Sequence, residues 1–400
     1  MIREPQPPVP VASNETTDGI RVAMIGLRGV PATYGGVERA VEELSAHLVE
    51  RGHHVTVYAR SAYSDPSVRR HRGINVRHLP QVNTKHAEAA SHTVMAIAHA
   101  LLSRRYDLVH LHATGPGALA PLVRMGRTPV VVTIQGLDWR REKWGAGARP
   151  VLRLAARLAA TTANRTIVVS RELQRHFRET YGADTVYIPN GVPIENETED
   201  DVPPHLDLSA QGFILSLGRL VPEKHVHTLI KAYRRVDGDL PLVIAGPDSH
   251  SPKYVDALRE LARADKRVQL VGPQYGSDKQ WLMNNALAFV QPSSIEGLPI
   301  ALLEALSAGR FPIVSDIPEN LEPVTIDGDA LGLSVPVGDA AALADAIRQA
   351  VRTQDRQQIG QRLAAHVRSE YDWHAIAEAT ESVYEGVIAA RRRSRHGRRP

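Results

Sequence analysis

The amino-acid sequence predicts an α/β fold in which two doubly wound domains face each other across a cleft. Short β-branched apolar segments alternate with helical segments, a pattern typical of parallel sheets that helices cover on both faces. The alternation occurs in two series, and an acidic, proline-containing segment at 193–210 separates them. The length of 400 residues suits two domains of roughly 150–200 residues each.

Each predicted strand is a short apolar run, and the runs follow one another in chain order. The first, at 20–27, ends in glycines and precedes an amphipathic helix from Val37 to Arg51. The remaining strands of the first series are predicted at 54–60, 74–80, 107–113, 129–136, 165–170 and 185–191. Those of the second series are predicted at 213–220, 240–246, 267–272, 287–293 and 311–316. Because parallel sheets bind ligands at the carboxyl ends of their strands, we expect the site between the two domains.

The composition is that of a globular protein, with 43% apolar and 23% charged residues and no cysteine. A disulfide, a thiolate metal site and a cysteine nucleophile are therefore excluded. The net charge of +4 includes six arginines in the last ten residues, and subtracting them leaves −2 for residues 1–390. This charge argues against nucleic acid as a partner. No apolar run reaches membrane-spanning length, so we expect a cytoplasmic protein, at most peripheral at the inner face of the cell membrane.

Both ends of the chain are polar. Residues 1–19 are rich in proline and have no apolar core, which predicts a disordered tail and not a signal peptide. Residues 391–400 form a basic tail, in which Arg391–Arg399 is a candidate contact for anionic lipid. A solubilising end without further role is the alternative.

Two glutamates, Glu296 and Glu304, frame the segment EGLPIALLE. If a helix starts at Pro299, the eight-residue separation places the carboxylates about 12 Å apart along its axis. This distance is too long for two carboxylates that act as acid and base on the same bond. It suits contacts of the two carboxylates with the two ends of an extended ligand. Free N–H groups at the helix start favour an anion such as a diphosphate. Two solvated glutamates on a surface helix are the alternative.

A glycine-rich loop from Gly26 to Arg39 follows the first predicted strand and opens a helix, which is the setting of a phosphate cradle. Its glycine spacing does not match the dinucleotide fingerprint. The second strand also ends in Tyr58-Ala59-Arg60 without an acid for the ribose, which disfavours a nicotinamide enzyme. A plain tight turn at Gly35 and Gly36 is the alternative.

Two cations, Arg219 and Lys224, follow the first strand of the second series. At the carboxyl end of that strand they would clamp a pyrophosphate and stabilise it as a leaving group. The alternative is an ordinary helix-terminal charge for Lys224 and packing of Arg219 against a neighbouring acid.

Together these motifs give the chain a resemblance to the family 4 glycosyltransferases, which have the GT-B architecture of two facing Rossmann-like domains. The resemblance extends from Ile20 to about Ala390 and rests on YGGVER, YIPNGV, GRLVPEK, EGLPIALLE, SAGRFPIVSD and YDWHAIAEATESVYEGV in this order. It implies an acceptor-side domain at 20–192, a linker at 193–210, a donor-nucleotide domain at 211–370 and a helix at 371–390 that returns to the first domain.

The resemblance also implies the residues of the site. The implied donor-binding residues are Gly35, Gly36, Arg219, Lys224, Glu296, Gly297, Leu298, Ile300 and Glu304. Among them, Arg219 and Lys224 would hold the diphosphate. Glu304 would hold the ribose, and Glu296 would lie against the donor sugar. Arg219, Lys224 and Glu296 are thus the implied catalytic residues. Enzymes of this family retain anomeric configuration and generally need no metal, and the sequence shows no His/Asp/Glu cluster at ligand spacing.

The sequence departs from the family pattern in the second half of the first domain and at the start of the second. Gln135 follows the strand at 129–136, where the family often has a histidine, so a base at this position is in doubt. His225 stands where glycine is common. For His110 and His112 we expect one side chain in the core and the other at the rim of the cleft.

The stretch GLDWRREKW at 136–144 resembles a bacterial subgroup that includes rhamnosyltransferases of surface polysaccharide assembly. The subgroup favours a dTDP- or UDP-sugar. The acceptor side would then be lined by Gln135, Asp138, Trp139, Arg140 and Lys143. Packing in the core is the alternative for Trp139, and it is the interpretation we favour for Trp144.

Arg149, Arg153 and Arg157 recur every four residues beside leucines, which places them on one stripe of a helix. A basic amphipathic helix near the acceptor side suggests contact with anionic lipid that holds a lipid-linked acceptor. A solvated helix face is the alternative.

We therefore expect a retaining, metal-independent glycosyltransferase, hexosyl or deoxyhexosyl in type, without a cofactor. It would move a sugar from a nucleotide-diphosphate donor to a saccharide or lipid-linked acceptor. Two other classes remain open. A nucleotide-sugar epimerase or hydrolase of the same fold would turn over the donor without an acceptor, and a non-catalytic sugar-nucleotide binding protein would convert nothing.

Overall fold

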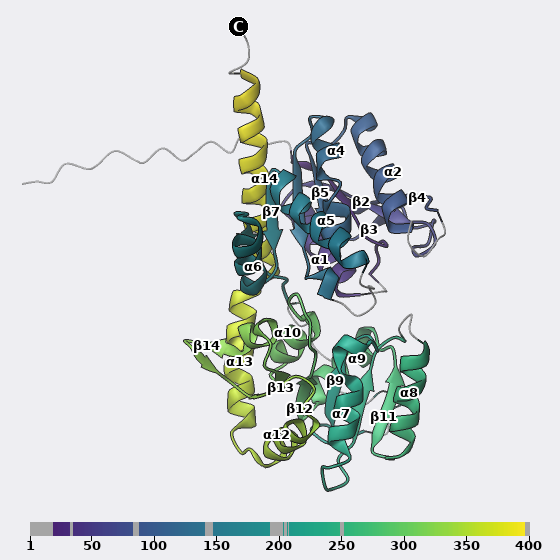
Figure 1. The fold of residues 1–400 in the computed structure, drawn as a ribbon, viewed down its shortest axis with the longest axis vertical. Helices are drawn as coiled ribbons and strands as arrows, with labels where there is room; N and C mark the ends of the chain where they lie inside the picture. The colour runs from purple at the N-terminus through teal and green to yellow at the C-terminus, as the bar shows by residue number, and fades with distance from the viewer. Residues whose placement is uncertain are drawn as a thin grey trace, which may run out of the picture.

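The computed structural model describes residues 19–32, 35–82, 88–140, 147–192, 203, 206, 208–248 and 252–396. The chain forms two lobes, each built around one main sheet, and a long C-terminal helix runs alongside the first (Figure 1). The tail predicted before residue 19, most of the predicted linker, Lys143 and Trp144 lie outside the described residues.

The first lobe contains an eight-stranded sheet in the order β3-β4-β2-β1-β5-β6-β7-β8. All its neighbouring strands are parallel except the pair β3 and β4. The strands are β1 (Arg21–Ile25), β2 (His54–Arg60), β3 (Arg70–His71), β4 (Ile74–Leu79), β5 (Leu108–His112), β6 (Val130–Ile134), β7 (Arg165–Val168) and β8 (Val186–Tyr187). The strand order reverses between β1 and β5, and ligands bind at such switch points.

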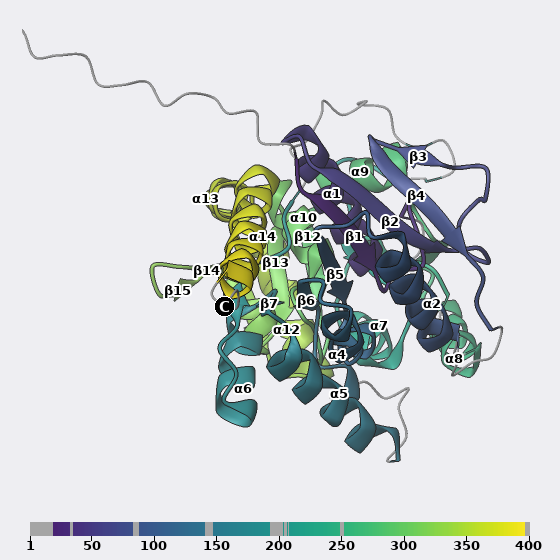
Figure 2. The ribbon, with the colours of Figure 1, turned by 90° about the horizontal axis from the view of Figure 1, so that it is seen from above.

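Helices cover both faces of this sheet because alternate residues of its buried strands point to opposite sides. The helices of this lobe are α1 (Gly36–Glu50), α2 (Glu88–Ser103), α3 (Thr114–Gly117), α4 (Ala120–Met125), η1 (Asp138–Arg140), α5 (Ala148–Thr162) and α6 (Arg171–Tyr181). One face packs against α1 and the C-terminal helix α14 (Trp373–His396), and the other packs against α2, α4 and α5 (Figure 2).

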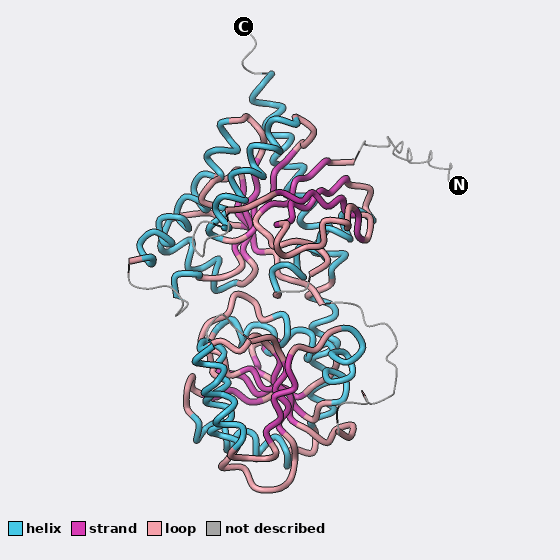
Figure 3. Tube along the Cα trace, turned by 90° about the vertical axis from the view of Figure 1, so that its right-hand side faces the viewer, coloured by secondary structure: helices cyan, strands magenta, loops and turns pink. Residues whose placement is uncertain are grey.

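The second lobe contains a six-stranded parallel sheet in the order β11-β10-β9-β12-β13-β16. Its strands are β9 (Ile214–Leu217), β10 (Leu242–Ala245), β11 (Val268–Gly272), β12 (Ala288–Gln291), β13 (Phe311–Ser315) and β16 (Leu333–Val335). Figure 3 shows the two sheets as separate strand layers, one in each lobe. The predicted α/β fold with two doubly wound domains is confirmed.

Nine further helical segments belong to the described part of this lobe. They are η2 (Pro222–Lys224), α7 (Val226–Tyr233), α8 (Pro252–Arg263), α9 (Gly276–Asn285), α10 (Ile300–Ser307), α11 (Pro318–Leu321), η3 (Glu322–Val324), α12 (Ala340–Arg352) and α13 (Arg356–Glu370). A small hairpin of β14 (Thr325–Ile326) and β15 (Asp329–Ala330) follows η3. The sequence patterns missed β3, β14, β15 and β16, which have only two or three residues each.

The last helix, α14, packs against α1 of the first lobe. Glu381 accepts hydrogen bonds from Arg51 at 2.7 Å and pairs with His53 at 2.9 Å. Further along, the Tyr384 hydroxyl lies 2.6 Å from Nδ1 of His110. The helix continues to His396, so the predicted separate tail from residue 391 is wrong for residues 391–396, and the last four residues lie outside the described part. No described helix is long and apolar enough to cross a membrane.

His110 and His112 are both fully buried on the same face of β5, and their ring centroids are 4.1 Å apart. The expectation that one of them lies at the cleft rim is therefore wrong, because residues i and i+2 of a strand share a face. Burial lowers the pKa of both imidazoles. His110 bridges Tyr384 and Thr133, at 2.6 and 2.7 Å, so it ties α14 to the sheet.

Candidate active site

The segment EGLPIALLE forms the start of α10, on the side of the second lobe that faces the first. The helix begins at Ile300, and Pro299 is its N-cap with extended backbone, ψ 99°. The predicted start at Pro299 is thus one residue too early. Glu296 and Glu304 have exposed side-chain fractions of only 10% and 7%, so neither is a solvated glutamate.

Glu296 forms an ion pair with Lys224, with 2.5 Å between its Oε1 and the lysine Nζ. The same oxygen accepts a hydrogen bond from Nε2 of Gln291 at 2.6 Å. Lys224 ends η2, which follows β9, and Gln291 is the last residue of β12. The adjacent strands β9 and β12 therefore bring Lys224, which is predicted to bind the diphosphate, into direct contact with Glu296, which is predicted to bind the donor sugar.

Glu304 is held from both lobes. Its carboxylate pairs with Nζ of Lys279 on α9, at 2.7 and 2.6 Å, and with Nε of Arg39 on α1 at 3.3 Å. Burial lowers the pKa of Lys279, and the charge of Glu304 offsets part of this effect. Sequence reasoning assigned no role to either cation, although Arg39 ends the motif YGGVER; nothing in the local pattern around Lys279 indicates a ligand role.

Arg219 lies two residues after β9 and lines a hollow of only about 10 Å³ together with Lys224 and Gln291. A larger hollow of about 330 Å³ lies where Arg171, Tyr187 and Tyr371 meet, away from these residues. All the described residues that line the hollow beside Arg219 belong to the second lobe.

The two lobes touch at two glycines. A Cβ on Gly297 would lie 1.9 Å from the carbonyl oxygen of Gln135, and one on Gly36 would lie 3.2 Å from Cδ1 of Ile300. Gly35 has φ 176°, an extended conformation open to any residue, so the tight-turn interpretation is wrong there. The contact at Gly297 requires a small residue because main-chain atoms of the two lobes meet there, whereas at Gly36 the Ile300 side chain would have to shift by only a few tenths of an ångström.

The floor of the cleft is made of buried polar side chains at the ends of β12 and β13. Nε2 of Gln291 donates to Oγ of Ser293 at 3.0 Å, and Nδ2 of Asn320 donates to Oγ of Ser315 at 2.8 Å. Oδ1 of Asn320 is buried and has no hydrogen-bond partner among the described residues. Sequence reasoning missed this network, which the strand order assembles.

The predicted acceptor-side residues lie after β6, opposite α10. Oε1 of Gln135 accepts a hydrogen bond from Nδ2 of Asn190 at 3.1 Å, so this amide is already oriented. Asp138 is partly exposed and Arg140 is exposed. Trp139 is only 4% exposed and packs in the core near His176, with 5.8 Å between ring centroids. Its predicted place on the acceptor surface is therefore wrong.

His225 has φ 51°, in the left-handed region that favours glycine. The left-handed backbone at this position explains why the family commonly has glycine there. The residue follows Lys224 directly and precedes α7, so it sets the turn that presents the lysine.

Glu319 is a buried carboxyl group that sequence reasoning also missed. Burial raises its pKa to about 7, and the charges of Glu172 and Glu296 act in the same direction. Its own backbone N–H and the charge of Arg140 act in the opposite direction. A titratable group thus lies within electrostatic reach of both Glu296 and the acceptor-side Arg140.

The family comparisons divide the chain at the same place as the two lobes. Residues 34–196 match the model of Glycosyltransferase Family 4, and residues 198–366 match that of Glycosyl transferases group 1. The chain is a glycosyltransferase. Its relatives include the glycogen synthase of Mycobacterium tuberculosis, with 28% identity over 94% of this chain and 96% of that protein.

Two solved structures show the same GT-B fold as this glycosyltransferase. Sucrose-phosphate synthase from Thermosynechococcus elongatus has a TM-score of 0.80 at 22% identity, over 93% of this chain and all of that one. Anabaena HepE in complex with UDP and glucose has a TM-score of 0.75 at 19% identity, over 92% of this chain and all of that one. At these identities the likeness concerns the fold, and the site must be argued from this chain's own residues.

Proposed function

We propose that this glycosyltransferase moves a sugar from a nucleotide-diphosphate donor, a dTDP- or UDP-sugar by preference, to a saccharide or lipid-linked acceptor. The transfer retains anomeric configuration and uses no metal. The observation that carries the proposal is the pair of buried carboxylates, Glu296 just before α10 and Glu304 on it, each held by a cation and opposite the glycine loop of the first lobe. The proposed class of donor is supported by HepE, which has a similar fold and whose structure contains UDP and glucose.

The diphosphate would lie between Arg219, Lys224 and the start of α10. An ammonium group has three donors, so Lys224 can keep its bond to Glu296 and still donate to a phosphate oxygen. The backbone N–H groups of Gly297, Leu298 and Ile300 add the field of a helix N-terminus, whereas Pro299 has no N–H to donate. As the bond to the sugar breaks, these groups offset the charge that grows on the departing diphosphate.

Glu296 would position the donor sugar, and the acceptor hydroxyl would attack from the face that the diphosphate leaves. Gln291 restrains Glu296 on the other side, which limits the positions its carboxylate can take. We assign no covalent nucleophile. Glu304 would accept hydrogen bonds from the ribose hydroxyls, because a carboxylate has about four lone-pair sites and its two cations use only part of them.

The acceptor would lie against Gln135, Asp138 and Arg140 of the first lobe. Beyond them, α5 exposes Arg149, Arg153 and Arg157. The same helix exposes Val151 and Leu154, with exposed fractions of 66% and 57%. Arginines beside exposed aliphatic side chains suit the interface of an anionic membrane, where cationic and apolar groups bind together. We therefore propose peripheral binding at the inner face of the cell membrane and an acceptor of surface polysaccharide assembly, in a subgroup resembling the rhamnosyltransferases.

The donor is tested by thermal unfolding with UDP, dTDP, GDP and ADP. At 100 times its dissociation constant, the correct diphosphate adds about 2.7 kcal/mol to the free energy of unfolding. Glu304→Gln keeps the shape of the side chain and should lose most of this gain, whereas Glu385→Gln on the exposed side of α14 should keep it. No stabilisation of the folded wild type by any of the four would contradict the donor site.

The reaction is tested with the matching nucleotide sugar. Release of nucleotide only when an acceptor is present supports transfer. Rapid donor turnover without acceptor would identify an epimerase or hydrolase, and binding without turnover would identify a binding protein. Proton magnetic resonance of the product then reports whether the anomeric configuration is retained.

Membrane contact is tested by co-sedimentation with vesicles. We expect wild type to bind anionic vesicles more than neutral ones, and the triple variant Arg149→Gln, Arg153→Gln, Arg157→Gln to lose this difference. The control is a triple variant of the second lobe that removes the same number of positive charges, and it should bind vesicles as wild type does. Its substitutions are Arg259→Gln, Arg263→Gln and Arg362→Gln. Equal binding of wild type to both vesicles would contradict the proposal.

A further inference from the structure

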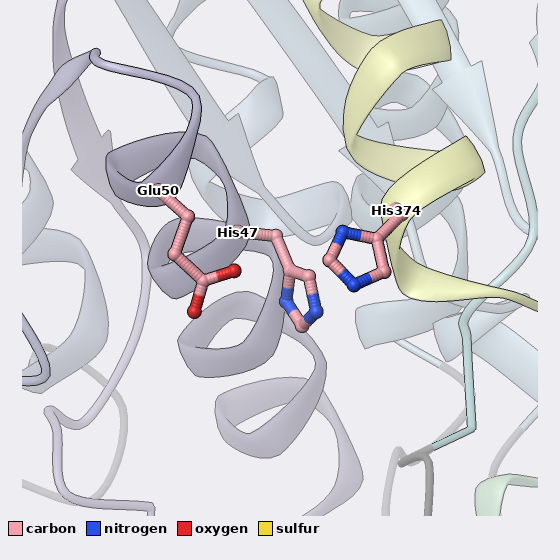
Figure 4. Close-up of side chains that lie close together, drawn as sticks. All are labelled: His47, Glu50 and His374. Carbon is pink, nitrogen blue, oxygen red and sulfur yellow. The ribbon is translucent and has the colours of Figure 1, made fainter.

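We propose that His47, Glu50 and His374 form a zinc site that joins α1 to the C-terminal helix α14. His47 and Glu50 lie in the last turn of α1, and His374 lies in the first turn of α14. Figure 4 shows the His47 ring between the Glu50 carboxylate and the His374 ring. One ligand atom from each residue lies within 4.8 Å of the others. The two histidines are 327 positions apart in the sequence, which is why no ligand spacing is apparent there.

The hydrogen bonds of His47 prepare it to bind a metal. Its Nδ1 lies 2.9 Å from the backbone oxygen of Glu43, an acceptor, so Nδ1 carries the proton. The other ring nitrogen, Nε2, then has a free lone pair. A carbonyl behind a ligating histidine is the usual arrangement in metal sites, because it fixes both the tautomer and the ring orientation.

The other two ligands are available. Across the described residues, no hydrogen bond or ion pair occupies the carboxylate of Glu50 or the ring nitrogens of His374. Nearby cations are already paired, since Arg51 binds Glu381 and Arg72 binds Glu43. A cation between the two helices would therefore meet a carboxylate that has no direct ion-pair partner among the described residues.

The helices that carry the ligands are held in place by neighbouring contacts. Trp373, next to His374, is buried, and its ring stacks on His47 with centroids 6.2 Å apart. The rings of His47 and His374 meet edge to face with centroids 4.8 Å apart. Two turns along α14, Glu381 pairs with Arg51 and His53. The backbone positions of the three ligands are thus set before any ion binds.

Two imidazoles and one carboxylate match the ligand preferences of zinc, and water would complete four-coordination. Tetrahedral zinc with bonds of about 2.0–2.2 Å needs ligand atoms about 3.3–3.5 Å apart. The widest separation must therefore close by up to about 1.4 Å, which rotation of the exposed side chains of Glu50 and His374 can provide. Eleven residues of α1 separate His47 from Gly36, about 16 Å along the axis, so the site is structural and plays no part in the transfer.

The test uses the full chain without a histidine tag, stripped with EDTA and returned to chelator-free buffer. Zinc chloride is titrated by calorimetry, and thermal unfolding is followed in parallel. Wild type, His374→Ala, Glu50→Gln and the control His54→Gln are compared. His54 is an exposed histidine of β2 outside the cluster.

We expect one zinc per chain and a raised unfolding temperature for wild type and His54→Gln, with no such effect of magnesium. His374→Ala and Glu50→Gln should bind zinc at least about tenfold more weakly, since even groups behind the ligands contribute 10–100-fold to affinity. An unfolding temperature of wild type that zinc leaves unchanged would overturn the proposal. So would equal zinc affinity in wild type and His374→Ala, or an equal effect of magnesium.

Discussion

The contact between Gly297 and Gln135 gives a sharp test of whether the two lobes must meet for transfer. In Gly297→Ala the added Cβ would lie 1.9 Å from the carbonyl oxygen and 2.7 Å from the carbonyl carbon of Gln135. Cβ atoms essentially never come closer than 3.0 Å to such neighbours, so the two backbones must separate by about 1 Å. No side chain can rotate to relieve the clash, because both partners are main-chain atoms.

A misplacement of about 1 Å between reacting groups costs about 100-fold in rate. We therefore expect Gly297→Ala to lower kcat/KM for transfer about 100-fold. Nucleotide affinity should change only a few-fold, since separating the lobes stretches the 3.3 Å contact of Glu304 with Arg39 but leaves its ion pair with Lys279 inside the second lobe. Initial rates, diphosphate titrations and the radius of gyration in solution measure the three quantities.

Gly386→Ala on α14 is the matched control, because nothing lies within 4 Å of its added Cβ. It should keep full activity and gain up to about 1 kcal/mol in stability from the higher helix propensity of alanine. Wild-type activity of Gly297→Ala, with an unchanged radius of gyration, would show that transfer does not depend on this approach and would refute the reasoning.

Three further predictions concern charged groups of the cleft. Arg219→Ala and Lys224→Ala should each lower turnover about 100-fold, as loss of one group that stabilises developing charge does elsewhere; activity near wild type in both would remove them from the proposed clamp. Glu304→Ala leaves the 14% exposed Lys279 unpaired and should lower the free energy of unfolding by about 3–5 kcal/mol in denaturant titrations. Adding Lys279→Met to Glu304→Ala should restore most of the lost free energy of unfolding. A loss below about 1 kcal/mol in Glu304→Ala alone would count against this pairing. Glu319 has its pKa raised from 4.5 to about 7 by burial, so the folded state binds its proton more tightly than the unfolded state, and stability falls as pH rises through this range. The raised pKa of Glu319 corresponds to about 3 kcal/mol of stability at low pH, and this contribution is fully lost above pH 7. Glu319→Gln should remove this part of the pH dependence. Curves of stability against pH that run parallel for the variant and wild type would disprove the prediction.

Much of the fold could be predicted because its strands are nearly continuous apolar runs. The run VVVTI of β6 is buried along its whole length, and a parallel sheet covered on both faces produces such runs. Two-residue strands such as β3 and β14 have no periodicity of their own and depend on a neighbouring strand. The end of α14 was misplaced because arginines favour a helix as much as a solvated tail.

The candidate site could be predicted only where the chain itself carries a motif. The segments at Lys224 and at Glu296 were singled out separately, yet their ion pair depends on the adjacency of β9 and β12. Arg39 and Lys279 were missed because their contacts with Glu304 depend on how closely α1 and α9 approach this residue. Trp139 was misassigned because its acceptor-side role was implied by the resemblance of GLDWRREKW to a subgroup, whereas its ring packs in the core.

The sequence by itself determined the two series of strands, the break between them, and the cationic and carboxylate motifs at the strand ends. Hydrophobic periodicity and turn residues act over a few positions, so a linear pattern contains this information. The tertiary structure alone decided which motifs meet: Gly297 with Gln135, Glu304 with Arg39, and His47 with His374. These pairs are separated by 162 to 327 positions, and strand order and lobe packing bring them together, which no local pattern specifies.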